Sequence, residues 1–161
     1  MNRKYSVQEF REAVNLIRDN FKDVILTADV IVGFPGETEK EFLNTFKFLK
    51  EINFYKIHVF KYSQRKGTKA AVMDNQVEPN IKEERSKTII ELSNKSQEFY
   101  HSIYQNKILE VLFEEKERDF QKGHTKNYIM VKVKEKQSII NENKSVKIIG
   151  MDAKGLIGEV L

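Results

Sequence analysis

The fold is decided by the stretch VILTADVIVGFPGET, residues 24–38. Its first nine residues form an apolar run rich in β-branched side chains and ended by Gly33, which is typical of a strand buried on both faces. A tight turn at 33–36 follows, and Thr38 with Glu41 forms a capping box that starts a helix. A strand, a glycine-containing turn and a helix in this order predict one unit of an α/β fold.

The flanking segments extend this unit on both sides. Residues 6–21 have the spacing of an amphipathic helix, the helix after Thr38 runs to about residue 52, and KIHVFKY at 56–62 predicts a second strand. This order predicts parallel strands covered by helices, but two strands are too few to bury a parallel sheet. We therefore expect residues 1–97 to belong to a larger α/β domain, or to self-associate or pair with another chain through an exposed sheet edge.

A different pattern follows the first 97 residues. Residues 79–104 have the periodicity of one long helix, and beyond residue 106 the chain breaks into short alternating segments. These segments are 108–113, 128–133, 145–149 and 156–161. Four or five short strands separated by Gly, Asn and Lys predict a small antiparallel β-barrel of about 60 residues beyond residue 106.

The composition restricts the chemistry. The 161 residues contain no Cys and only three His, so a disulfide, a thiolate nucleophile and an iron–sulfur cluster ligated from within this chain are excluded, and no metal site is expected. No window approaches the ~18 consecutive apolar residues of a membrane span, so we expect a cytoplasmic protein without a membrane anchor. The net charge of +4 permits a local basic patch for nucleic acid but does not by itself indicate one.

Asp29 and Ile31 are the first candidate binding residues. Alternate residues of a strand share a face, and here that face leads to a glycine turn that opens a helix, where parallel α/β sheets bind their ligands. A carboxylate beside an aliphatic side chain suits a ribose and a purine. The alternative is that the glycines serve only the turn and that Asp29 pairs with a neighbouring strand.

The second strand also leads to a loop with binding potential. His58, Phe60 and Tyr62 share one face of it, which suggests core aromatic residues, and the loop SQRKGT at 63–68 follows. Arg65 and its neighbouring lysines either contact phosphate or are merely solvated.

In the predicted barrel, the sequence GHTKNY at 123–128 reads as a loop that combines a cation with a ring. Lys126 and Tyr128 suit a phosphate and a stacked base, as on other small barrels that bind RNA. A purely structural hairpin, with Tyr128 as a core strand residue, is the alternative.

Together, the opening MNRKY, the motif DVIVGFPGET, the segment HVFKYSQRKGT and the barrel with GHTKNY resemble the radical S-adenosylmethionine methylthiotransferases. The resemblance covers essentially the whole chain and is strongest to the branch that acts on tRNA. It implies the end of a radical S-adenosylmethionine partial (β/α) barrel in residues 1–97 and a TRAM domain, an OB-like RNA-binding barrel, in residues 98–161. The two regions that bind the 4Fe-4S clusters in this family have no counterpart here, so the resemblance implies a C-terminal fragment, inactive alone.

The same resemblance assigns roles to individual residues. It implies that Asp29 binds the ribose of S-adenosylmethionine, that Ile31 packs on its adenine next to Gly33, and that the segment at Tyr62 and Ser63 meets the adenine edge. Arg65, Lys126 and Tyr128 are the expected contacts to RNA, and no catalytic residue is expected in this chain.

The implied reaction is transfer of a methylthio group to C2 of threonylcarbamoyladenosine next to the tRNA anticodon, with the anticodon stem-loop as the partner. Two alternatives stay open from the sequence. The chain is either a stand-alone TRAM-type RNA-binding protein with a non-catalytic barrel remnant, or part of the sister enzyme that modifies a ribosomal protein.

Overall fold

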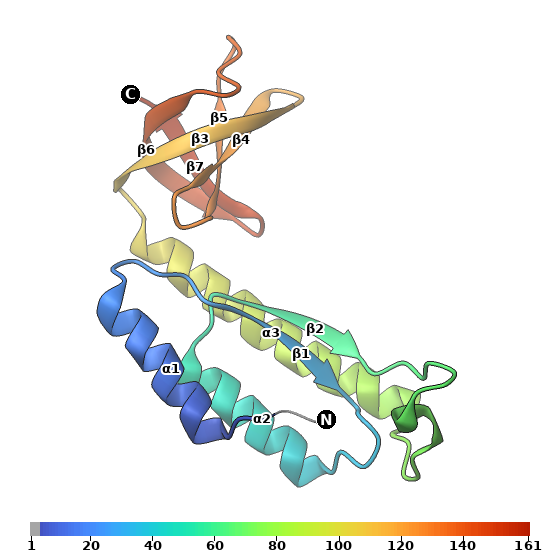
Figure 1. The fold of residues 1–161 in the computed structure, drawn as a ribbon. Coiled ribbons are helices and arrows are strands. Elements are labelled where there is room, and N and C mark those ends of the chain that lie inside the picture. The colour runs from blue at the N-terminus through green and yellow to red at the C-terminus, as the bar shows by residue number, and fades with distance from the viewer. Residues whose placement is uncertain (1–3) are drawn as a thin grey trace. The chain divides into compact units, whose positions relative to one another are not determined.

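The computed structural model describes residues 4–161, so Met1–Arg3 of the opening motif lie outside the described residues. The chain divides into two compact units, of which the first ends at Ser96 and the second comprises residues 97–161. Each unit is described by itself (Figure 1). No helix in the described part of the chain has the length and apolar character needed to cross a membrane.

The first unit alternates helices and strands, as the sequence predicts. Its elements are α1 (Val7–Asn20), β1 (Thr27–Val32), α2 (Glu39–Ile52), β2 (Lys56–Lys61), a short 3₁₀ helix (Lys69–Val72) and most of α3 (Pro79–Ile103). Both expected capping boxes form, with Ser6 and Glu9 at α1 and with Thr38 and Glu41 at α2. These boxes satisfy the first free N–H groups of each helix and fix where it begins.

β1 and β2 form a two-stranded parallel sheet in which Asp29 lies opposite His58. Val32 and Ile57 are buried against the helices, in a core that includes Ile89 of α3. The expectation of a strand buried on both faces is wrong, because exposed and buried residues alternate along β1 and the strand starts only at Thr27. No described element covers the second face, so that face is open.

The buried face of α3 is largely polar, and the apolar residues Phe99 and Ile103 of this helix are both exposed. Ser93 accepts a hydrogen bond from the N–H of Ile57 (2.9 Å), and Ser96 donates to the carbonyl oxygen of Phe54. These serines satisfy backbone groups at the start of β2 that lack a neighbouring strand. The helix therefore completes the hydrogen bonding of the sheet as well as covering it.

The second unit contains a closed five-stranded barrel with the strand order β3-β4-β5-β7-β6. Its strands are β3 (Ile108–Glu117), β4 (Phe120–Thr125), β5 (Met130–Lys134), β6 (Asn143–Asp152) and β7 (Gly155–Val160). The expectation of a purely antiparallel barrel needs one correction, since β5 and β7 pair in parallel.

β4 is the barrel strand that the sequence pattern did not reveal. Its inward positions are Gln121, Gly123 and Thr125, so it lacks the apolar alternation that marks a strand. Gly123 is required by close contact, because a Cβ atom there would lie 2.1 Å from the carbonyl oxygen of Leu112 on β3. Gln121 is fully buried and accepts a hydrogen bond from the N–H of Ile139 (2.9 Å), which holds the segment after β5 on the barrel.

Candidate functional site

The open face of the two-stranded sheet brings together four side chains that the sequence singled out. Asp29 lies opposite His58 and Ile31 lies opposite Phe60, and all four are exposed. Ile31 is 38% exposed and Phe60 is 53% exposed, so the interpretation of Phe60 as a core residue is wrong. No described residue gives the Asp29 carboxylate a hydrogen bond or an ion pair, so the alternative that Asp29 pairs with a neighbouring strand is not what the structure shows.

The turn after β1 is held by an ion pair that sequence reasoning missed. Glu37 accepts a hydrogen bond from the N–H of Gly33 (2.6 Å) and from Arg85 on α3 (2.8 Å). The Arg85 side chain is 7% exposed and that of Glu37 is 14% exposed, so water screens this pair little. A single Arg85–Glu37 pair thus ties the turn to a helix 48 residues later in the chain.

Gly33 is required at this turn for two reasons. Its φ of +71° is a conformation that other residues rarely adopt, and a Cβ atom would lie 2.3 Å from Cγ of Lys82. Because its N–H already donates to Glu37 and Lys82 packs against it, Gly33 offers a ligand no free donor and serves the turn.

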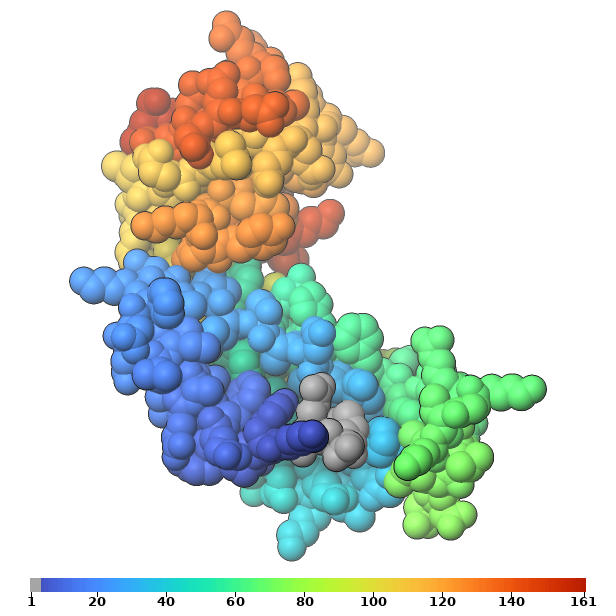
Figure 2. All heavy atoms as spheres, viewed as in Figure 1, coloured from blue at the N-terminus to red at the C-terminus, as the bar shows by residue number. Residues whose placement is uncertain are grey.

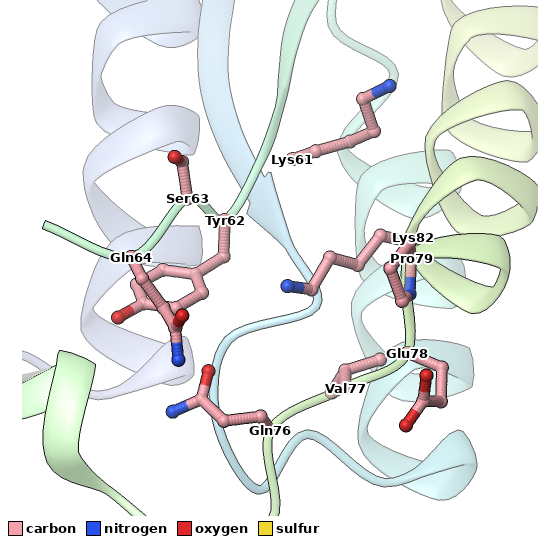
Figure 3. Close-up of a pocket in the computed structure, with 9 residues that line it drawn as sticks. All are labelled: Lys61, Tyr62, Ser63, Gln64, Gln76, Val77, Glu78, Pro79 and Lys82. Atoms are coloured by element: carbon pink, nitrogen blue, oxygen red, sulfur yellow. The ribbon is translucent and has the colours of Figure 1, made fainter.

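A polar pocket lies where β2 ends. Its lining comes from Lys61–Gln64 and from Gln76–Pro79 with Lys82 (Figure 3). The Lys82 ammonium lies over the ring of Tyr62, 5.3 Å from its centroid, and Phe34 packs edge-on against the same ring. The N–H of Tyr62 donates to the carbonyl oxygen of Val32 (2.8 Å), so Tyr62 is locked to the end of β1.

Arg65 lies in the loop that follows this pocket. In Figure 1 the loop, coloured green, projects beyond the end of the sheet, and in Figure 2 the green atoms protrude from the first unit. Arg65, Lys66 and Lys69 are all exposed, and the carbonyl oxygen of Arg65 accepts hydrogen bonds from the N–H (3.1 Å) and hydroxyl (2.8 Å) of Thr68. The loop therefore has local order while its cationic side chains remain accessible.

In the second unit, the turn after β4 is built to hold Tyr128 outward. The N–H of Tyr128 donates to the carbonyl oxygen of Thr125 (2.8 Å), and the Thr125 hydroxyl donates to Asn127 (2.6 Å). Asn127 in turn donates to the hydroxyl of Tyr104 (2.9 Å). Tyr128 has a φ of +68° and is 76% exposed, so the interpretation of it as a core strand residue is wrong.

The Tyr128 ring is stacked on the imidazole of His124, with the ring centroids 4.5 Å apart and the planes 13° apart. Nδ1 of His124 contacts the carboxylate of Glu114 on β3, which orients the imidazole. Lys126 is exposed in the same turn. The sequence singled out Lys126 and Tyr128, but it gave no sign of the supporting contacts with His124 and Glu114.

The donor groups of the described residues do not fit an iron–sulfur cluster. No group of three or more His, Cys, Asp or Glu side chains that could hold a metal occurs in residues 4–161, and the sequence has no cysteine. The open sheet face does fit part of S-adenosylmethionine, since it presents an unpaired carboxylate beside an aliphatic side chain.

Comparison with known proteins agrees with this chemistry. Residues 1–49 match the sequence profile of the Radical SAM superfamily. In agreement with its motifs, the chain is similar to radical S-adenosylmethionine methylthiotransferases.

Individual relatives extend the match to the whole chain. The chain is 42% identical to the threonylcarbamoyladenosine tRNA methylthiotransferase of Bacillus subtilis over 154 residues, which are 92% of this chain and 34% of that protein. It is 37% identical over its full length to the tRNA-2-methylthio-N(6)-dimethylallyladenosine synthase of Fusobacterium nucleatum, of which it covers 38%. It is also 39% identical over its full length to a probable threonylcarbamoyladenosine tRNA methylthiotransferase of Methanocaldococcus jannaschii, of which it covers 36%. The chain thus spans about a third of the length of these relatives.

Proposed function

We propose that this chain supplies part of the S-adenosylmethionine site and the RNA-binding domain of a tRNA methylthiotransferase. The observation that carries the proposal is the open face of β1 and β2, where the unpaired carboxylate of Asp29 lies beside Ile31 on the face that leads to the carboxyl ends of the two parallel strands. Ligands of parallel α/β sheets bind at this end. Two of the relatives named above carry the name threonylcarbamoyladenosine tRNA methylthiotransferase and the third is named a tRNA-2-methylthio-N(6)-dimethylallyladenosine synthase, which supports the same reaction class.

In this proposal the first unit is the last part of a radical S-adenosylmethionine partial barrel, with its open sheet face directed to the cofactor. Asp29 accepts hydrogen bonds from the ribose hydroxyls, and Ile31 packs on the adenine. Gly33 shapes the turn beside the site, and the backbone at Tyr62 and Ser63 meets the adenine edge. S-adenosylmethionine, when bound beside a 4Fe-4S cluster, supplies the radical and the methyl group in this family, and the cluster ligands belong to residues outside this chain.

The second unit is the proposed TRAM domain. A closed five-stranded barrel with an exposed ring and cation in one turn has the features by which OB-like barrels bind single-stranded RNA. Tyr128 offers a ring for a base, and Lys126 offers a cation for phosphate. Arg65, on the loop that follows β2, is the proposed contact to tRNA from the first unit.

Threonylcarbamoyladenosine beside the anticodon is the proposed substrate, with transfer of the methylthio group to C2. The relatives include enzymes named for this nucleoside and for dimethylallyladenosine, so the substrate is the part of the proposal to test first. tRNA is taken from cells in which this chain, either wild-type or Asp29→Asn, replaces the matching part of the Bacillus subtilis relative, because this chain alone has no cysteine to bind a cluster. The tRNA is digested, and its 2-methylthio nucleosides are measured by mass spectrometry.

We expect Asp29→Asn to lower the 2-methylthio product at least about 10-fold at unchanged protein abundance, because loss of one charged hydrogen-bond partner removes about 1.5–3 kcal/mol. Thr27→Val is the matched control, since Thr27 lies two residues earlier on the same exposed face. Full product with Asp29→Asn would show that the cofactor assignment is wrong. RNA binding without any gene-dependent 2-methylthio nucleoside would instead favour the stand-alone RNA-binding protein.

A further inference from the structure

We propose that the groove beside Tyr128 on the barrel is a pocket for one unpaired nucleobase that carries an amino group, namely adenine, cytosine or guanine but not uracil. The inference rests on the RNA binding proposed above and adds to it a preference for the base. The groove has a volume of about 490 Å³, within the range of about 300–1,000 Å³ usual for small-molecule sites. Its lining includes Glu110, Leu112, Glu114, His124, Lys126 and Tyr128.

One wall of the pocket is a fixed aromatic platform. His124 covers one side of the Tyr128 ring, and the 76% exposure of Tyr128 leaves the other side accessible. A bulky residue with a φ of +68° is a backbone outlier, and such outliers persist where the surrounding structure holds them. Here the hydrogen bonds of Thr125 and Asn127 hold the turn, so the ring is in place before a base arrives.

The floor and the opposite wall of the pocket come from β3. Leu112 is 43% exposed and supplies apolar surface between two carboxylates. Glu110 accepts a hydrogen bond from the hydroxyl of Ser145, and Glu114 contacts His124. Each of these carboxylates thus has one oxygen engaged, and the described residues give its second oxygen no hydrogen bond.

Two carboxylates decide what the pocket accepts. Ionised carboxylates only accept hydrogen bonds, and they repel a phosphate group, so the pocket favours the N–H groups of a base over the RNA backbone. Adenine, cytosine and guanine each present an amino group on the Watson–Crick edge. Uracil presents two carbonyl oxygens around a single N–H, and these oxygens would face the carboxylates. Lys126, which also lines the groove, offers a cation for the phosphate of the same nucleotide.

The test uses the 161-residue chain and 5′-labelled RNA heptamers, measured by fluorescence anisotropy at low salt. One heptamer is all uridine, and the others carry a single central A, C or G. We expect at least about fivefold tighter binding of one or more of the substituted heptamers, since a good pair of hydrogen bonds to a base discriminates by about 1–3 kcal/mol. Tyr128→Ala should weaken binding of every heptamer by about 5- to 150-fold.

Glu110→Gln is the decisive variant. A glutamine amide still accepts a hydrogen bond from Ser145, and it can also donate one to a carbonyl oxygen of uracil. We therefore expect the ratio of the affinities for the substituted and the all-uridine heptamers to fall to nearly one. Glu159→Gln, an exposed glutamate on β7, makes the same change of charge away from the pocket and should leave the preference unchanged.

Three results would overturn the inference. Equal binding of all heptamers by the wild-type chain would show that the groove does not select a base, while the proposed RNA binding would stand. An unchanged preference in Glu110→Gln would show that the carboxylates do not select the base. No binding of any heptamer would overturn the inference together with the RNA-binding part of the proposed function.

Discussion

Arg85→Met tests how the turn that follows β1 is held. Arg85 donates to the carboxylate of Glu37 at 2.8 Å and to its carbonyl oxygen at 3.0 Å, and both side chains are nearly buried. The third contact, to Glu39, joins Arg85 to a carboxylate that is 68% exposed, so it adds little. Methionine fills similar volume but leaves the Glu37 carboxylate buried without a counter-charge, which costs about 3–5 kcal/mol of unfolding free energy.

The assay is urea unfolding followed by hydrogen exchange of peptides from residues 27–61, because a whole-chain signal would mix the two units. With a urea m-value of about 2 kcal/mol/M, the unfolding midpoint of these peptides should fall by about 1.5–2.5 M. Peptides from residues 108–160 should keep their midpoint.

A double-mutant cycle sharpens this test. Glu37→Gln removes the charge while its amide oxygen still accepts from the N–H of Gly33. The double variant Arg85→Met/Glu37→Gln should therefore be more stable than Arg85→Met alone, because no buried charge remains. The reasoning would be refuted if the losses of unfolding free energy in the two single variants add up in the double variant. It would also be refuted if Arg85→Met lowered the urea midpoint by less than about 0.5 M.

Two further predictions concern one residue in each unit. Gly33→Ala should destabilise the first unit by more than about 1 kcal/mol, because the new Cβ atom clashes with Lys82 and the position has a positive φ. Gly36→Ala is the control for the backbone effect alone, because Gly36 has a φ of +82° but no atom within 4 Å of the added Cβ. Burial lowers the pKa of His101 from its usual value of 6.5. Below that pH the unfolded chain binds a proton that the folded chain does not. The second unit should therefore lose stability as the pH falls from 7 towards the folded-state pKa. His101→Gln should flatten this dependence when the unfolding of peptides from residues 108–160 is followed from pH 7 to 5. An unchanged slope in His101→Gln would contradict the prediction.

Local signals account for what the sequence predicted well. The two capping boxes lie within four residues of each helix start, and the apolar alternation of β2 is visible in six residues, so neither depends on distant contacts. The open face of β1 was missed because an apolar run reads the same whether one face or both are covered.

Long-range and polar features were not predictable in the same way. The Arg85–Glu37 pair joins residues 48 positions apart, and nothing near either residue marks it. The sequence pattern did not predict β4, because the inward positions of this strand are polar or small. The outward position of Tyr128 depends on a positive φ, which the hydrogen bonds of the surrounding turn impose and which a bulky side chain does not favour.

The exposed apolar side chains on well-ordered elements point to binding. Phe60 lies on a strand in a fixed register with β1, and Tyr128 lies in a turn held by several hydrogen bonds, yet each presents more than half of its surface to water. A loosely held chain would fold such rings inward to gain apolar burial, at roughly 25 cal/mol per Å². Both rings are instead held outward, next to Asp29 and His58 in one case and next to Glu114 in the other. A polar ligand with an aromatic ring binds to apolar surface that is flanked by polar groups in defined positions. An adenosyl group and an unpaired base are both ligands of this kind.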